Sequence, residues 1–391
     1  MSALAELRHS RRANLIAAAV LFAAAIVLPL FLGPLNGFID VSIKALAYVV
    51  MALGLNVVVG FAGLLDLGYV AFYAIGAYTV GWFASDYFSR VNHGKGIHVL
   101  VSGKAAEGTL SHMPTAGIHL NFVLLLVVAI ALTALAGALI GLPTLRLRGD
   151  YIAIVTLAFG EIVGRIAVNG DAIHVFGYKL TAGQQAIAPL DPIGFPGIGD
   201  FDQATNIRPF YWTALALVAL TLFVNFRLRD SRLGRAWIAI REDEVAAASM
   251  GVPLVRTKLL AYATGAALGG MAGVFLGFYI NSVNASTFEF SFSIFVLAMV
   301  ILGGLGSIWG VVLGALALSY INYYLIPDVF KGVPRTFGLD FDLTQLSFGI
   351  FGFLLVIMMV LRPEGLLPER RRKLELAEGV GTDESLYEAR L

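Results

Sequence analysis

Long apolar stretches alternate with short polar segments along most of this chain of 391 residues. Most stretches approach or exceed about 20 residues, the length at which an α-helix crosses the ~30 Å hydrocarbon layer of a membrane. They are uncharged, except that one contains Glu161 and Arg165. The stretches are 13–39, 45–65, 67–85, 120–145, 151–168, 209–226, 259–288, 290–327 and 343–361. This pattern predicts a protein embedded in a lipid bilayer.

Each stretch is expected to be helical, because backbone polar groups inside a bilayer must find their partners within the protein. The stretch 290–327 is too long for one span and carries Gly303, Gly304 and Gly306 near its middle, so we divide it in two. The predicted fold is all-α: a polytopic α-helical membrane protein with about ten transmembrane helices. The glycine-rich backbone around Asp66 and Gly303 leaves re-entrant turns open as an alternative at these two places.

Lysine and arginine are distributed unevenly between the segments that connect the stretches. With the N-terminus in the cytoplasm, 18 of the 27 fall in cytoplasmic segments and 8 on the outer side. Since cytoplasmic loops are enriched in these residues, both termini are predicted to lie inside the cell. The expected organisation is a cytoplasmic N-terminus at 1–13, a transmembrane permease domain at 14–361 and a cytoplasmic tail at 362–391. Outer loops are expected at about 86–119, 169–208 and 328–342, and a cytoplasmic loop is expected at 227–257.

The composition excludes several kinds of chemistry. Charged residues make up 14% of the chain, against about 25% in ordinary soluble proteins. The chain has no cysteine, which excludes disulfides, thiolate nucleophiles and cysteine-based zinc sites. It has no GxxxxGK loop followed by Ser or Thr, so it cannot cradle the phosphates of ATP, and we predict neither catalytic residues nor bound cofactors. Histidines in or beside the outer loops, such as His98 and His119, are irregularly spaced and are interpreted as solvated residues rather than metal ligands.

One connecting segment is strongly basic and is called the basic segment here, residues 227–258. Its sequence is RLRDSRLGRAWIAIREDEVAAASMGVPLVRTK. Glu242, Asp243 and Glu244 stand where acids favour the positive end of a helix dipole, and an alanine-rich run follows. Gly251 then supplies a stop signal. The pattern predicts a short helix over about 242–250 that either fits into a cleft of a partner protein or lies flat on lipid headgroups.

Four polar residues inside or beside the stretches are candidates for a translocation path. Glu161 and Arg165 share one helix face at i, i+4, and charges within a membrane mark functional sites unless they pair with each other. A structural ion pair is the alternative that we favour. Asn56 and Asp66 lie before and within a glycine-rich break. Asp66 either lines the path or, as we prefer, caps the helix expected to begin near Leu67.

Several motifs carry a family resemblance. In the basic segment, Ala246 and Ala247 precede Gly251 as in the EAA-then-glycine signature of binding-protein-dependent ABC importer permeases, with Glu244 one position further upstream than usual. The residues 53–78, 141–165, 234–273 and 295–315, with RPEGLL at 362–367, resemble in order the LivM-type permeases of branched-chain amino-acid transporters. The run LTAGQQ at 180–185 departs from the TGG-type run of many relatives, which leaves details of the outer loop and of the substrate open.

The resemblance implies an importer subunit that moves branched-chain or related amino acids across a bacterial inner membrane. The implied partners are cytoplasmic ABC ATPases that use ATP and Mg, a second permease of the LivH type, an extracytoplasmic binding protein and the lipid bilayer, with no nucleic acid. The residues implied to couple to the ATPase are Arg235, Arg241, Glu242, Asp243, Glu244, Ala246, Ala247 and Gly251. Urea or short amides are an alternative cargo. An ion-coupled carrier that uses Glu161 or Asp66, and a scaffold or channel, are alternatives of other classes.

Overall fold

The computed structural model describes residues 22–99, 116–144, 150–195, 199–329, 347–362 and 365–367. The predicted cytoplasmic N-terminus at 1–13, most of the predicted outer loop at 328–342 and nearly all of the predicted tail at 362–391 lie outside these residues. Arg146 and Arg148, which entered the charge count, lie outside them as well.

Helices make up most of the described chain. They are Phe22–Phe31, α3 (Gly37–Asn56) continued by the π-helical turn η1 (Val57–Phe61), α4 (Val70–Phe83), α6 (Phe122–Thr144), α7 (Asp150–Asn169), α8 (Arg208–Arg229), α9 (Arg232–Glu242), α10 (Glu244–Ser249), α11 (Leu254–Ile280), α12 (Phe290–Gly303), α13 (Ile308–Tyr320) continued by η5 (Ile321–Val329), and α15 (Ser347–Leu361). Short 3₁₀ turns are η2 (Asp86–Phe88), η3 (Val91–Gly94) and η4 (Ala285–Thr287).

Six of the described helices are long and apolar enough to cross a membrane. They are Gly37–Phe61, Phe122–Thr144, Tyr151–Asn169, Arg208–Arg229, Leu254–Ile280 and Ile308–Pro327. Phe22–Phe31, Val70–Phe83 and Phe290–Gly303 are shorter apolar helices. The predicted class, a polytopic helical membrane protein, is confirmed, whereas the count of ten spans stays a prediction.

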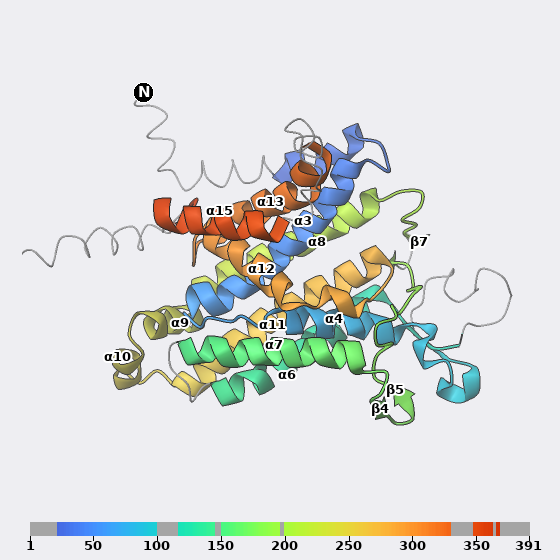
Figure 1. Ribbon diagram of the computed structural model, residues 1–391, viewed down its shortest axis with the longest axis horizontal. Helices are drawn as coiled ribbons and strands as arrows, with labels where there is room; N and C mark the ends of the chain where they lie inside the picture. The colour runs from blue at the N-terminus through green and yellow to red at the C-terminus, as the bar shows by residue number, and fades with distance from the viewer. Residues whose placement is uncertain are drawn as a thin grey trace, which may run out of the picture.

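The helices α3 and α11 form the centre of the bundle and pack against most of the others. In Figure 1, α6 and α7 flank α11 and α4 on one side, and α13 and α15 lie on the other. Glycines allow the closest approaches: a Cβ on Gly76 of α4 would overlap the backbone of Gly270 of α11. Such contacts between small residues are how helices associate in membranes, where burial of apolar surface gives little drive. The glycine-rich tracts of α4 and α11 therefore serve packing.

Short strands gather at one end of the bundle. β1 (Ala84–Ser85) pairs antiparallel with β3 (Ile118–Leu120), which pairs parallel with β2 (Ile97–Val99). Two hairpin pairs follow, β4 (His174–Val175) with β5 (Tyr178–Lys179) and β6 (Gly194–Phe195) with β7 (Gly199–Asp200). The prediction of an all-α chain missed these strands, because two or three residues carry no readable alternation of apolar and polar positions.

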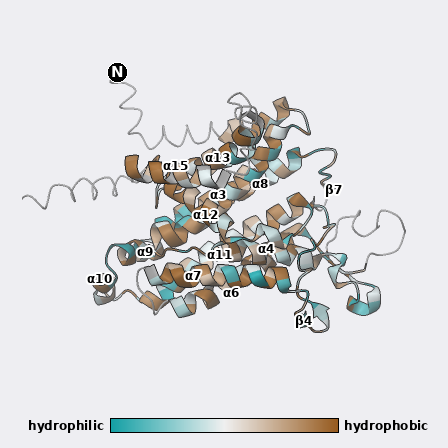
Figure 2. Ribbon diagram, in the orientation of Figure 1, coloured by the Kyte–Doolittle hydropathy of each residue, from teal (hydrophilic) through white to brown (hydrophobic). Residues whose placement is uncertain are grey.

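The two ends of the bundle differ. In Figure 1 the strands β4, β5 and β7 lie at one end, and α9 and α10 project at the opposite end. Figure 2 shows hydrophobic residues along the bodies of the helices between them, including α15, and hydrophilic residues gathered around the β4 end. The helix bundle therefore has an apolar middle and two polar ends, one with the strands and one with α9 and α10.

Two helix breaks meet at the end from which α9 and α10 project. One follows η1 and contains Gly63 and Asp66, and the other joins α12 to α13 through Gly304 and Gly306. The Asn56 side-chain Oδ1 accepts a hydrogen bond from the backbone N–H of Gly306 at 2.9 Å, which holds the breaks together. Residues 365–367 cover the second break, since the N–H groups of Leu366 and Leu367 donate to the carbonyls of Leu302 and Gly303 at 2.9 and 3.1 Å.

Candidate functional site

The helix predicted in the basic segment is present as α10, but it begins two residues later than predicted. Asp243 has an extended backbone, with φ −153° and ψ 109°, and acts as the N-cap. Its Oδ1 accepts from the N–H groups of Val245 and Ala246 at 2.8 and 2.9 Å. The run of acids thus supplies a capping side chain as well as favourable charge. Gly251 follows the helix with φ +86°, a conformation that favours glycine.

Three side chains anchor the basic segment to the bundle. The fully buried Trp237 indole donates through Nε1 to the Thr257 carbonyl at 2.7 Å. The Lys258 ammonium, only 3% exposed, binds the Glu244 carboxylate at 2.7 Å and so ties α10 to α11. The third is Arg241, whose Nη1 donates to the Gly60 carbonyl in η1 at 2.7 Å. The basic segment is therefore attached to the start of α11 and to η1, which continues the end of α3.

Apart from Arg241 and Glu244, which take part in the anchoring contacts, the predicted coupling residues fall into two groups. Glu242, Asp243, Ala246 and Gly251 are exposed, as is Arg235, whose Nη1 donates to the Asp230 carbonyl at 3.0 Å. Ala247 is buried and faces the bundle, whereas its neighbours Val245 and Met250 are 67% and 85% exposed. The exposed face of α10 therefore includes Val245, Ala246, Ser249 and Met250, while Ala247 lets α10 lie close to the bundle.

Arg241 borders a cavity of about 340 Å³ beside the helix breaks. The cavity is lined by Gly60, Gly63 and Leu305 among others. Gly63 has φ +69°, and a Cβ there would run into the Arg241 side chain, so only glycine suits this approach. The guanidinium thus connects α9 to η1, and Asn56, fully buried, connects α3 to Gly306.

Asp66 is buried and closes a turn in the first break. Its Oδ1 accepts from the Gly68 N–H at 2.9 Å. The prediction that it caps a helix beginning near Leu67 is wrong, because α4 begins at Val70, whose N–H donates to the Ser293 hydroxyl at 3.0 Å. The residues after Asp66 instead contact the middle of α7. The N–H of Leu67 donates to Thr156 Oγ1 at 3.0 Å, and the backbone of Gly68 packs against α7 beside it. Asp66 therefore positions the break against α7.

Glu161 and Arg165 lie one turn apart on α7. Their closest charged atoms, Arg165 Nε and Glu161 Oε2, are 3.9 Å apart, and the two side chains are 79% and 49% exposed. The four path candidates named from the sequence therefore form no single cluster. Asn56 and Asp66 support the helix breaks, and the charged pair lies on an exposed helix face.

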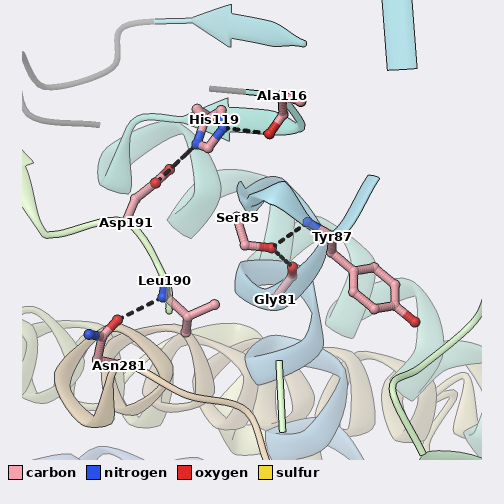
Figure 3. A network of polar contacts seen from close by, with 8 residues as sticks. All are labelled: Gly81, Ser85, Tyr87, Ala116, His119, Leu190, Asp191 and Asn281. Carbon is pink, nitrogen blue, oxygen red and sulfur yellow. Dashed lines mark hydrogen bonds and ion pairs between the residues drawn. The ribbon is translucent and has the colours of Figure 1, made fainter. Parts of the chain in front are cut away.

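A buried polar network organises the opposite end. Figure 3 shows the His119 ring pointing toward the Asp191 carboxylate, with Nδ1 2.9 Å from Oδ2. Burial lowers the pKa of His119, but the hydrogen bond to Asp191 and the charges of Asp191 and Asp86 outweigh it and raise that pKa above its ordinary value. His98 stacks on His119 with ring centroids 4.9 Å apart. The prediction of solvated histidines is wrong for His119, which is buried.

Sequence reasoning missed Trp237 and Lys258 as anchors. A weak signal existed for Lys258, the last charge before the long apolar stretch at 259–288, but its partner Glu244 lies 14 residues earlier and only the folded segment brings them together. The same holds for His119 and Asp191, which are 72 residues apart in the chain.

Comparisons with known proteins give one consistent result. Residues 37–360 match the family described as "Branched-chain amino acid transport system / permease component". The chain is 38% identical over 357 residues to the high-affinity branched-chain amino acid transport system permease protein LivM of Salmonella typhimurium, covering 88% of this chain and 73% of the relative. LivM of Escherichia coli is 37% identical over 368 residues, covering 89% and 74%. The Salmonella typhimurium permease LivH is 28% identical over 217 residues, covering 53% and 64%. No solved structure matches the chain significantly.

Proposed function

This chain belongs to the family of permease components of branched-chain amino acid transport systems, and from that premise we propose how it works. It is the membrane-spanning subunit of an ATP-driven importer, and branched-chain amino acids are its cargo. It hydrolyses no ATP itself; ATP and Mg are bound by cytoplasmic ABC ATPase subunits, on which it depends for energy.

The observation that carries this proposal is the attachment of α9 and α10. A motor can move the permease only through an element that is exposed to the motor and rigidly joined to the membrane helices. The exposed face of α10 meets the first requirement, and the contacts of Trp237, Arg241 and Lys258 meet the second. Arg241 extends the connection to Gly60, near the end of η1, which continues α3. Movement of α10 on ATP binding therefore shifts the two helix breaks, which act as the inner gate.

The remaining assignments follow from the same scheme. Both termini and the loop 227–257 face the cytoplasm, the loops near 86–119, 169–208 and 328–342 face outward, and ten helices span a bacterial inner membrane. The permease pairs with a second permease of the LivH type and receives its cargo from an extracytoplasmic binding protein. Support comes from the placement of the strands and of α9–α10 at opposite ends of an apolar bundle.

The test replaces Ala246 with Trp, which adds bulk to the exposed face of α10 while the buried face stays intact. Ala204→Trp is the matched control, an exposed alanine in the loop at the other end. We expect Ala246→Trp to abolish co-purification of the ATPase and ATP-dependent uptake of labelled leucine, while Ala204→Trp retains both. Uptake that survives Ala246→Trp, or that survives ATPase inhibition and collapses with the ion gradient, contradicts the proposal and favours an ion-coupled carrier.

A further inference from the structure

A cleft of about 590 Å³ lies between α7 and the segment that leads from η4 into α12. Its size is within the range of small-molecule sites in proteins, roughly 300–1,000 Å³. The α7 helix packs closely on this segment at Gly164, where a Cβ would come within 2.9 Å of the Phe288 carbonyl. The polar residues that line the cleft are Glu161, Arg165, Gln184, Asn284, Ser286, Glu289 and Ser291.

The position of the charges within the membrane is unusual. Glu161 is eleven residues beyond the start of α7, about 16 Å along the helix, which is near the middle of the membrane span proposed for α7, and Arg165 lies one turn further on. Charged side chains at this depth are unfavourable against lipid and face a watery cavity or the interior of an assembly. Both Glu161 and Arg165 are nevertheless largely exposed in the isolated chain. This face of α7 therefore borders water or a second subunit rather than lipid.

Arg165 and Glu161 do not satisfy each other's hydrogen-bonding groups. Strong charge-assisted hydrogen bonds have donor–acceptor distances of about 2.7–2.9 Å. The 3.9 Å separation of Arg165 and Glu161 is longer, and an exposed i, i+4 pair contributes little to stability. Glu289 makes only a 3.4 Å contact with the Ser291 hydroxyl within the cleft. A guanidinium and two carboxylates thus remain available to a ligand.

The chemistry of the lining matches a zwitterion with an apolar side chain. Arg165 offers planar, bidentate recognition of a carboxylate, and Glu161 and Glu289 offer acceptors for an ammonium. Val168 and Phe288 form apolar wall beside them. We propose that this cleft binds the transported amino acid on its way through the membrane, with Arg165 on the carboxylate and Glu161 or Glu289 on the ammonium. The proposal rests on the transport function proposed above and adds a site within this chain.

The absence of cysteine from the chain allows a direct test. Single cysteines are introduced as Ser286→Cys and Ser291→Cys in the cleft, and as Ala204→Cys in the outer loop for comparison. Labelling by a small charged thiol reagent is measured in the assembled permease–ATPase complex in lipid nanodiscs, with leucine, leucinamide or 4-methylpentanoate as the probe. Leucine uptake by the unmodified complex is measured in parallel, so that failure of the transport function is recognised separately.

The expected result is that leucine slows labelling of both cleft cysteines, while leucinamide, which lacks the carboxylate, and 4-methylpentanoate, which lacks the ammonium, do not. Labelling of Ala204→Cys is unaffected by any probe. Adding Arg165→Gln weakens protection by leucine about tenfold, the effect of losing one charge-assisted hydrogen bond. Lys179→Gln, which removes an exposed charge outside the cleft, leaves protection unchanged.

Two results overturn the site. The first is that the complex transports leucine, but each cleft cysteine is labelled at the same rate with leucine as with either analogue. The second is a complex in which neither cleft cysteine can be labelled although it transports leucine, because the cleft is then a dry contact with the second permease. Equal protection by leucine in the Arg165→Gln variant overturns the role of the guanidinium.

Discussion

The ion pair between Lys258 and Glu244 and the ion pair between Arg165 and Glu161 differ in almost every physical respect. Lys258 and Glu244 are 2.7 Å apart with the lysine side chain 3% exposed, whereas Arg165 and Glu161 are 3.9 Å apart with the arginine side chain 79% exposed. A buried charge with a short contact fixes one element to another, because either partner left alone would be unfavourable. An exposed, loosely paired charge fixes nothing and stays available. The first pair is suited to transmitting movement and the second to binding.

The largest expected effect concerns the anchored end. Replacing Trp237 with Ala removes a fully buried ring and its hydrogen bond to Thr257, which should lower the free energy of unfolding by about 3–5 kcal/mol. Trp212→Ala is the matched control, since Trp212 also donates through Nε1, to the Ile26 carbonyl at 3.1 Å, but its ring is 37% exposed on α8 and should lose less, about 1–2 kcal/mol. Unfolding in detergent micelles measures both. Equal losses would show that α9 is not anchored through its tryptophan.

The difference between the two ion pairs can be tested directly by removing the cation of each. Lys258→Gln leaves Glu244 without its partner and should lower the free energy of unfolding by about 1–3 kcal/mol. Arg165→Gln should change it by less than about 0.5 kcal/mol, because the pair is exposed. The same unfolding measurement applies. A larger loss for Arg165→Gln would make the α7 pair structural, as the sequence had led us to favour.

A smaller effect is expected for the contact between α9 and η1. Arg241→Lys keeps the charge but removes the planar donor that reaches the Gly60 carbonyl, a loss of about 1 kcal/mol. The measurement is leucine transported per ATP hydrolysed in proteoliposomes, which should fall while ATPase binding persists. Arg229→Lys, which alters an exposed contact with Asp230, serves as control. An unchanged ratio would remove Arg241 from the coupling route.

The smallest effect belongs to the outer end and depends on pH. The pKa of His119 is raised in the folded chain by Asp191 and Asp86, and its unfolded value is near 6.5. The protonated ring therefore stabilises the network fully below about pH 6.5, and this stabilisation is lost as the pH rises through the raised folded pKa. Hydrogen exchange at residues 116–121 should accelerate over that window. Asp191→Asn should abolish the dependence, and a dependence that persists in this variant would contradict the role of the His119–Asp191 contact.

The sequence predicted those features that depend on neighbouring residues. The apolar stretches identified the membrane helices, and the acids before an alanine-rich run, with Gly251 after it, predicted α10 to within two residues at its start. The orientation of α10 was beyond reach, because six residues carry too little periodicity to show that Ala247 faces inward. The mistake at Asp66 has a similar cause: only packing against Thr156 and Ser293 decides where α4 begins.

Contacts between segments that are far apart in the sequence could not be predicted from it either. The pairing of His119 with Asp191 and of Asn56 with Gly306 joins residues 72 and 250 positions apart, and nothing local to either residue indicates its partner. The cleft beside α7 combines Glu161 and Arg165, which the sequence singled out, with Glu289, which it did not. Composition and periodicity identify the charges within a membrane, and the fold decides which of them share a cavity.

The central claim is that the exposed face of α10 receives work from a motor inside the cell. A single cysteine at Ala246→Cys, treated with a membrane-impermeant thiol reagent, tests it most directly because the chain has no cysteine of its own. The account predicts no labelling in intact cells, labelling in inside-out vesicles stripped of the ATPase, and protection when the ATPase is restored. Labelling of Ala246→Cys from the outside of intact cells would contradict it.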